Sequence, residues 1–173
     1  MDLVRANAFE RTFEIDTSLD RGTAFTIDRG DRQYLVTARH LLPPDDPTPE
    51  VTASIRLRRD SMRLSLLPVR PPQADAAVAP LDEALTIGDL PLPADGDGLV
   101  WSQQMYFLGY PYGLATNINS ADSGERIPFV KSGIWSAVAT VDGIYTIYLD
   151  GHNNPGSGGV VATGCPAVQR CDP

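Results

Sequence analysis

Apolar and polar residues alternate with a period of two in segment after segment of this chain. The clearest cases lie near residues 9–16, 23–28 and 51–58, where each apolar side chain is followed by a polar one. Successive side chains of a β-strand point to opposite faces of the sheet, so this period indicates strands with one buried face. Such a chain can bury its apolar residues only by packing sheets together or by closing a sheet on itself.

The predicted strands are short and are separated by turn sequences. The chain has 15 Gly and 15 Pro among 173 residues, and they interrupt almost every window long enough for a core helix. We therefore predict an all-β barrel or sandwich. The predicted strands are Phe9–Ile15, Thr23–Ile27, Gln33–His40, Val51–Leu57, Met62–Leu67, Ala74–Leu81, Gln104–Leu108, Phe129–Ala139, Ile144–Leu149 and Gly158–Ala162.

A stretch rich in Pro, Asp and Gly, from Leu81 to Gly98, holds no sustained strand pattern and divides the chain near its middle. We read it as a connection between two lobes of one domain that spans residues 1–173. The first β lobe is predicted over about residues 9–81, the connection over about 82–98 and the second β lobe over about 99–173.

Charge and hydropathy exclude several classes of function. The net charge is −8 and no run of Lys and Arg occurs, so nucleic acid is not an expected partner. No stretch of about 18 apolar residues exists, and acidic residues occur where a signal peptide would be basic and then apolar. The chain is therefore expected to lie in the cytoplasm, with a mature form whose export signal is absent as the alternative, and not in a membrane. Its two cysteines, Cys165 and Cys171, match no metal-binding spacing and are expected to be incidental thiols.

The chain has only two histidines, His40 and His152. His40 ends an apolar run, and an imidazole at a rigid strand end is well placed to transfer a proton. A histidine that only caps a strand is the alternative. His152 lies in a loop-like segment with no acidic partner pattern, so we expect a structural role for it.

Two further residues have suitable surroundings for chemistry. Ser157 stands among glycines, which expose a hydroxyl and let the backbone approach a ligand, although an ordinary Gly-rich turn has the same composition. Pro155 occupies the first Gly position of the hydrolase pattern Gly-x-Ser-x-Gly, so that pattern is absent. Asp75 opens a small apolar run, where a carboxylate needs a partner such as an imidazole; a surface aspartate at a strand start is the alternative.

The order His, Asp, Ser along one all-β chain resembles the trypsin-like (chymotrypsin-fold) serine peptidases, of the compact bacterial type without disulfides. The likeness covers roughly residues 9–162, and the ordered set of motifs is more specific than any one of them. The motifs include counterparts of the family's Gly-Thr-Gly-Phe, Leu-Thr-Ala-x-His and Asp-Ile-Ala-Val. They are Gly22–Ile27, Leu35–His40, Asp75–Val78, Phe107–Pro111, Gly133–Ser136 and Pro155–Gly159.

The resemblance implies two six-stranded β-barrels with the active site between them. His40 and Asp75 would come from the first barrel and Ser157 from the second, and together they would cleave peptide bonds through an acyl-enzyme. The substrate would be a protein or peptide. No metal or organic cofactor is implied.

Two features depart from the family's pattern. Gly156 directly precedes Ser157, so the oxyanion-hole N–H two residues before the serine would belong to Pro155, which has none. Loss of one such donor costs about 100- to 1,000-fold in turnover, unless the loop presents the Gly156 N–H together with that of Ser157. Only 16 residues follow Ser157. We therefore expect a second barrel that is incomplete at its C-terminal end, with an open edge available for association.

Two main hypotheses follow. The first is a serine endopeptidase that uses His40, Asp75 and Ser157. The second is a catalytically silent protein of the same fold that binds peptides or partner proteins in the same crevice. A plain β-sandwich binding module is a third hypothesis, which leaves the ordered His, Asp and Ser to chance.

Overall fold

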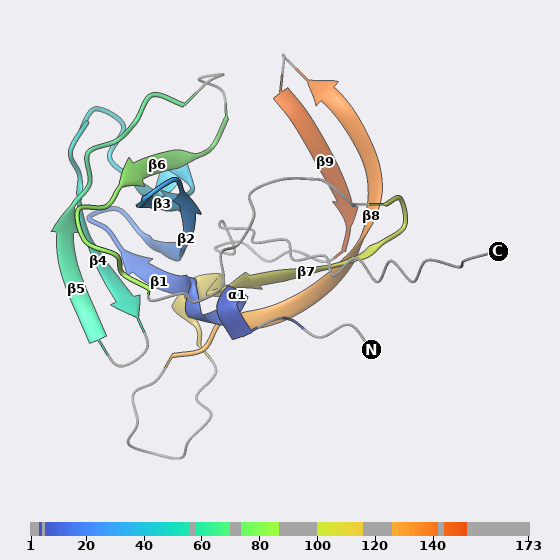
Figure 1. Cartoon of the computed structure of the whole chain (residues 1–173), viewed down its shortest axis with the longest axis horizontal. Helices are drawn as coiled ribbons and strands as arrows, with labels where there is room; N and C mark the ends of the chain where they lie inside the picture. The colour runs from blue at the N-terminus through green and yellow to red at the C-terminus, as the bar shows by residue number, and fades with distance from the viewer. Residues whose placement is uncertain are drawn as a thin grey trace.

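The computed structural model describes residues 4, 6–55, 58–69, 74–86, 100–115, 126–141 and 144–151. These residues form two curved antiparallel sheets, one from the first half of the chain and one from the second (Figure 1). The predicted all-β fold is therefore confirmed. In chain order the elements are α1 (Ala6–Glu10), β1 (Thr12–Asp16), β2 (Arg21–Arg29), β3 (Arg32–Thr37), the 3₁₀ turn η1 (Arg39–Leu41), β4 (Glu50–Ile55), β5 (Arg58–Arg63), β6 (Ala77–Pro80), β7 (Gln104–Gly109), the 3₁₀ turn η2 (Pro111–Gly113), β8 (Phe129–Val141) and β9 (Ile144–Asp150).

The first sheet has six strands in the order β5-β4-β1-β2-β3-β6, and it closes into a barrel. Closure comes from the segment after β5, where the Leu67 N–H donates to the Val78 carbonyl of β6 at 2.8 Å. Closing a sheet in this way pairs strands that would otherwise be open edges. The barrel encloses a core of Phe13, Ile15, Ala24, Leu35, Ala38, Leu41, Leu42, Val51, Ala53, Leu64, Ala77, Ala79 and Leu81.

The structure corrects four of the predicted strands. The strand predicted over residues 74–81 is β6 and begins only at Ala77, which leaves Asp75 before the strand. The strand predicted from Phe9 begins only at Thr12, because residues 6–10 form the short helix α1. The strand predicted to reach His40 is β3 and ends at Thr37, which leaves His40 on η1. The strand predicted over residues 62–67 is β5 at residues 58–63, a segment rich in charged residues that an apolar pattern does not detect.

Strand β1 also departs from the expected pattern of one buried face. Phe13 and Ile15 point into the barrel core, as predicted. Thr12 and Glu14, on the opposite face, are each only 3% exposed. This outer face is buried because the second lobe packs against it, so β1 lies between the two lobes.

The second sheet is an antiparallel meander in the order β7-β8-β9, and it confirms three of the predicted strands. The register of β8 against β9 shifts between Trp135 and Ala137. Next to this irregularity the Trp135 ring stacks on Trp101, with ring centroids 6.0 Å apart. The strand predicted over residues 158–162 lies outside the described residues.

The predicted connection is described only up to residue 86. Its first residues are held by the buried side chain of Gln33, which accepts the Leu85 N–H at 2.9 Å and donates to the Thr86 carbonyl at 3.1 Å. Residues 87–99 lie outside the described residues, so the lobe boundaries remain a prediction.

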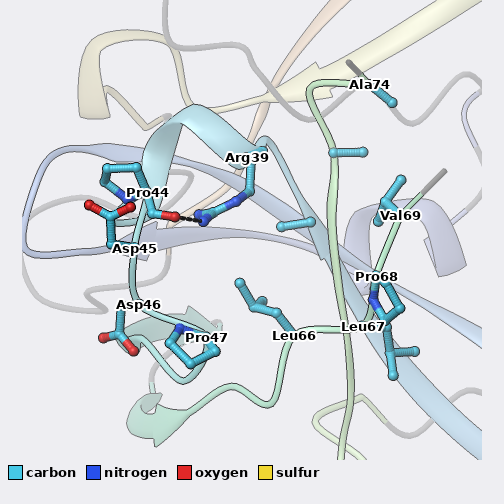
Figure 2. A pocket seen from close by; sticks show the side chains of 12 residues that line it. Arg39, Pro44, Asp45, Asp46, Pro47, Leu66, Leu67, Pro68, Val69 and Ala74 are labelled. Atoms are coloured by element: carbon cyan, nitrogen blue, oxygen red, sulfur yellow. Dashed lines mark hydrogen bonds between the residues drawn. The ribbon is translucent and has the colours of Figure 1, made fainter. Parts of the chain in front are cut away.

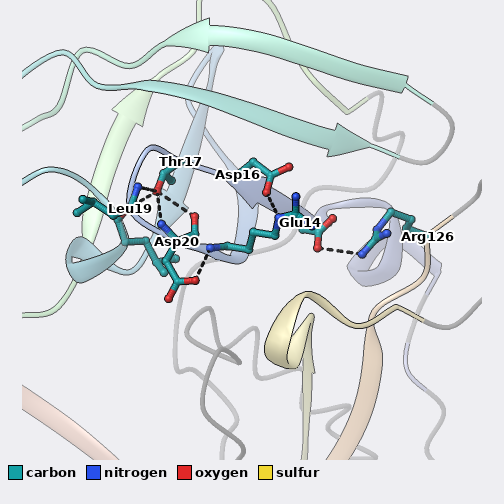
Figure 3. A network of polar contacts seen from close by, with 8 residues as sticks. Glu14, Asp16, Thr17, Leu19, Asp20 and Arg126 are labelled. Atoms are coloured by element: carbon teal, nitrogen blue, oxygen red, sulfur yellow. Dashed lines mark hydrogen bonds and ion pairs between the residues drawn. The ribbon is translucent and has the colours of Figure 1, made fainter.

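Polar contacts of Arg126 and Tyr110 join the second lobe to strands β1 and β2 of the first. Arg126 donates to the Glu14 carboxylate at 2.9 Å, as Figure 3 shows, and its carbonyl accepts the Tyr110 hydroxyl at 3.1 Å. The Tyr110 backbone N–H donates to the Thr23 hydroxyl at 2.9 Å. Burial raises the pKa of Glu14 although the Arg126 charge opposes the shift, and burial likewise raises the pKa of Tyr110. The Glu14 carboxylate therefore depends on Arg126 to remain ionised between the lobes.

We expect Arg126→Met to lower the free energy of unfolding by about 1–3 kcal/mol at neutral pH, because it leaves the Glu14 carboxylate buried without its cation. A raised pKa means that ionised Glu14 costs stability as the pH rises through that pKa. The loss should therefore shrink near pH 4, where Glu14 is protonated. Urea unfolding of the parent and the variant at neutral pH and near pH 4 measures this loss of free energy of unfolding.

The double variant Glu14→Gln/Arg126→Met is the matched control, since it has no carboxylate to titrate. The double variant should be less stable than Glu14→Gln by the same free energy of unfolding at both pH values. If Arg126→Met alone also lost the same free energy of unfolding at both pH values, the dependence of Glu14 on Arg126 would be contradicted.

Candidate active site

His40 lies on a one-turn 3₁₀ helix that neighbouring buried residues hold in place. Its neighbours Leu41 and Leu42 are each 1% exposed and belong to the barrel core. The Thr17 hydroxyl donates to the Leu41 carbonyl at 2.7 Å. At the end of β3 the Thr37 hydroxyl donates to the Thr23 carbonyl at 2.8 Å. The imidazole is therefore attached to a rigid part of the first lobe although it lies outside a strand.

The structure brings His40 and Asp75 together. Thr37 at the end of β3 pairs with Ala77 at the start of antiparallel β6, so the residues just beyond them lie at the same end of the barrel. The Asp75 carboxylate accepts the His40 backbone N–H at 2.9 Å and lies 2.6 Å from the imidazole Nδ1. Two contacts to one residue fix both the position and the orientation of the ring.

Charge and hydrogen bonding favour one tautomer of His40. Partial burial raises the pKa of Asp75, but hydrogen bonds from His40 and from the Arg39 N–H outweigh it and leave this pKa below its usual value. An ionised carboxylate only accepts, so the proton between the two residues belongs on Nδ1 and the lone pair on Nε2. The side chains of His40 and Asp75 remain 59% and 56% exposed, which leaves the ring accessible.

Gly22 leaves the space that this turn needs. A Cβ built on Gly22 would lie 2.3 Å from Leu41 Cδ1 and 3.2 Å from Leu41 Cγ. Leu41 fills that space and anchors the turn that carries His40. The glycine of the motif Gly22–Ile27 thus has a packing role.

Figure 2 shows a groove of about 550 Å³ lined by residues that adjoin His40 and Asp75 in the sequence. Ala74 and Ala76, which flank Asp75, line it together with Arg39 and the apolar residues Leu66 and Val69. Arg39 is a functional candidate that the sequence did not reveal. The sequence signal for it is the pair of prolines that follows Leu42. Prolines have no N–H, so the carbonyls of this loop need donors from elsewhere, such as the Arg39 side chain.

Several predicted site residues lie outside the described part of the chain. They are Ser157, Gly156, Pro155, His152, Cys165 and Cys171. The catalytic role of His40 and Asp75, the contribution of Ser157 and the oxyanion hole therefore remain predictions. The expected incompleteness of the second barrel and its open edge likewise concern residues beyond 151.

Within the described ranges, no group of three or more His, Cys, Asp or Glu side chains could hold a metal ion. No helix in this part of the structure is long and apolar enough to cross a membrane.

A six-stranded sheet closed by the Leu67–Val78 bridge, a second antiparallel sheet of three described strands, and a His–Asp pair where β3 and β6 meet agree with the double-barrel fold that the resemblance implied. The profile of the trypsin-like peptidase domain matches residues 22–164 of the sequence. The chain therefore belongs to the trypsin-like peptidase family. No curated protein sequence matches the chain closely enough to count as a relative.

Solved structures of proteases have the same fold. The HtrA-type protease AlgW with tripeptide is 22% identical with a TM-score of 0.63, and the match covers 93% of this chain and 49% of that one. Deg5 is 19% identical with a TM-score of 0.62, and the match covers 91% and 76% of the two chains. The apo MamO protease domain from Magnetospirillum magneticum is 13% identical with a TM-score of 0.58, with 93% and 82% covered. This chain spans about half the length of AlgW.

We expect Gly22→Ala to destabilise the fold by about 1–3 kcal/mol, because the new methyl group overlaps the buried Leu41 side chain. Shortening Leu41 removes the overlap. The double variant Gly22→Ala/Leu41→Ala should therefore lose less free energy of unfolding than the two single variants lose in sum. Thermal or urea unfolding of the four proteins measures this coupling. Strictly additive losses would contradict the packing of Leu41 against Gly22.

Proposed function

We propose that this chain is the catalytic domain of a serine endopeptidase. In this proposal Ser157 is the nucleophile, His40 the general base and Asp75 the group that orients His40. The observation that carries the proposal is the pair of contacts from Asp75 to His40, through the backbone N–H and through Nδ1.

The tautomer favoured by Asp75 suits this chemistry. With the proton on Nδ1, the Nε2 lone pair is available to accept the Ser157 hydroxyl proton as the oxygen attacks a peptide carbonyl. The imidazolium then gives that proton to the leaving amine as the C–N bond breaks. A water molecule attacks the acyl-serine ester, again with its proton passing to Nε2, and releases the acid while Ser157 regains its proton. Asp75 stays ionised throughout and stabilises the imidazolium.

The oxyanion hole would be formed by the backbone N–H groups of Ser157 and Gly156. Pro155 has no N–H, so the usual second donor is missing unless the loop presents Gly156. This feature favours a second candidate function, a catalytically silent protein that binds peptides or partner proteins at the same place. The retained His40–Asp75 geometry favours the peptidase.

The proposed substrate is a protein or peptide segment. The structure of AlgW, which has the same fold, is that of a protease with a tripeptide. No metal or organic cofactor takes part in the proposed reaction.

A fluorophosphonate probe tests the proposal, since it forms a covalent bond only with an activated serine. We expect the parent to be labelled at Ser157 and Ser157→Ala to remain unlabelled. Asp75→Asn should stay folded and react about 10³- to 10⁴-fold more slowly, because the amide no longer holds His40 in the required tautomer. Intact-protein mass spectrometry gives the extent of labelling, and peptide mapping gives the site.

Folded parent protein that takes up no label would rule out the peptidase. If that protein retained a fluorescent peptide in a binding assay, the silent peptide-binding function would replace it. Equal labelling of the parent and Ser157→Ala would place the reactive group elsewhere.

A further inference from the structure

Three consecutive carbonyl groups follow the His40 turn and point to one side chain. The Arg39 guanidinium donates to the carbonyls of Leu42, Pro43 and Pro44 at 3.3, 2.9 and 2.6 Å. The last of these contacts is the dashed line in Figure 2, where Arg39 reaches across to the Pro44 side of the groove. One half-buried side chain therefore provides donors for the whole loop that leaves the turn.

This loop depends on Arg39 for chemical reasons. Pro43 and Pro44 have no N–H, so the segment cannot form a strand ladder, and its carbonyls need donors from a side chain or from water. Only a guanidinium presents five N–H groups in a planar fork that can reach several carbonyls at once. No cysteine occurs before residue 165, so no disulfide can hold the turn to the barrel.

The backbone of Arg39 acts on the other side of the same turn. Its N–H contributes to the lowered pKa of the Asp75 carboxylate, which accepts the adjacent His40 N–H at 2.9 Å. Arg39 thus connects the two ends of the turn, with its N–H on Asp75 and its side chain on the loop beyond Leu42.

We propose that Arg39 is the positioning residue that holds the His40 imidazole on Asp75, an inference that rests on the proposed peptidase function for its effect on catalysis. The side chain makes no contact with substrate in this role. It fixes the loop, the loop fixes the turn, and the turn fixes the Nδ1 to carboxylate hydrogen bond. Misplacing a catalytic group by about 1 Å costs up to about 100-fold in rate.

The test compares Arg39→Met and Arg39→Lys with Arg63→Met as the matched control. Arg63 lies on β5, its side chain is 74% exposed, and its ion pair among the described residues is a long one of 3.6 Å with exposed Glu50, so removing its charge should change little. Two measurements are made on each folded protein. One is the second-order rate of fluorophosphonate labelling; the other is the low-field NMR signal of the proton between His40 Nδ1 and Asp75.

For Arg39→Met we expect labelling about 10- to 100-fold slower and loss or broadening of the low-field signal. Arg39→Lys should fall between it and the parent, since an ammonium keeps the charge but cannot reach three carbonyls. Arg63→Met should match the parent in both measurements. A merely stabilising role for Arg39 would lower the melting temperature without changing the signal of the folded protein.

Parent-like labelling and an unchanged signal in Arg39→Met would overturn the proposal. If Arg39→Met fails to fold, the same two measurements are made on Arg39→Lys. A low-field signal in Arg39→Lys identical to that of the parent then overturns the proposal. A parent that shows the signal but takes up no label would end the proposed peptidase function. The positioning role would then be tested by the NMR signal alone.

Discussion

The hydrogen bonds that Asp75 accepts connect two segments that are far apart in the sequence. They exist because antiparallel pairing of β3 with β6 brings the end of one strand and the start of the other to the same end of the first barrel. The carboxylate stays ionised because N–H groups of Arg39 and His40 surround it and lower its pKa. A depressed pKa means that the pair stabilises the fold above the usual aspartate value near 3.9 and loses that contribution as the pH falls.

The motif that begins at Gly22 connects this pair to the rest of the molecule. Gly22 makes room for Leu41, which anchors the His40 turn, and the Thr23 carbonyl accepts a hydrogen bond from the end of β3. The Thr23 hydroxyl accepts the backbone N–H of Tyr110 from the second lobe. Two consecutive residues of β2 therefore support the His40 turn and hold the second lobe against the first. The proposed site, which takes His40 and Asp75 from the first lobe and Ser157 from the second, depends on both of these supports.

The alternating pattern predicts most of the strands, and the resemblance carried by the ordered His, Asp and Ser motifs implies that His40 and Asp75 meet. Tertiary packing accounts for what the sequence did not reveal. Glu14 looks like the solvent-facing residue of an alternating strand, yet it is buried because a second lobe covers it. The 3₁₀ turn under His40 has no periodicity of its own, since Leu41 and the barrel core impose it. The role of Arg39 depends on loop carbonyls whose directions no local pattern encodes.

In the proposed mechanism His40, held by Asp75, acts on Ser157. A crystal structure of the protein after reaction with a fluorophosphonate shows these three residues together. We expect phosphorus bonded to Ser157 Oγ, with His40 Nε2 within about 3 Å of an oxygen of the adduct and the Nδ1 contact to Asp75 intact. A crystal of treated protein in which Ser157 is unmodified, or lies far from His40, would contradict this mechanism.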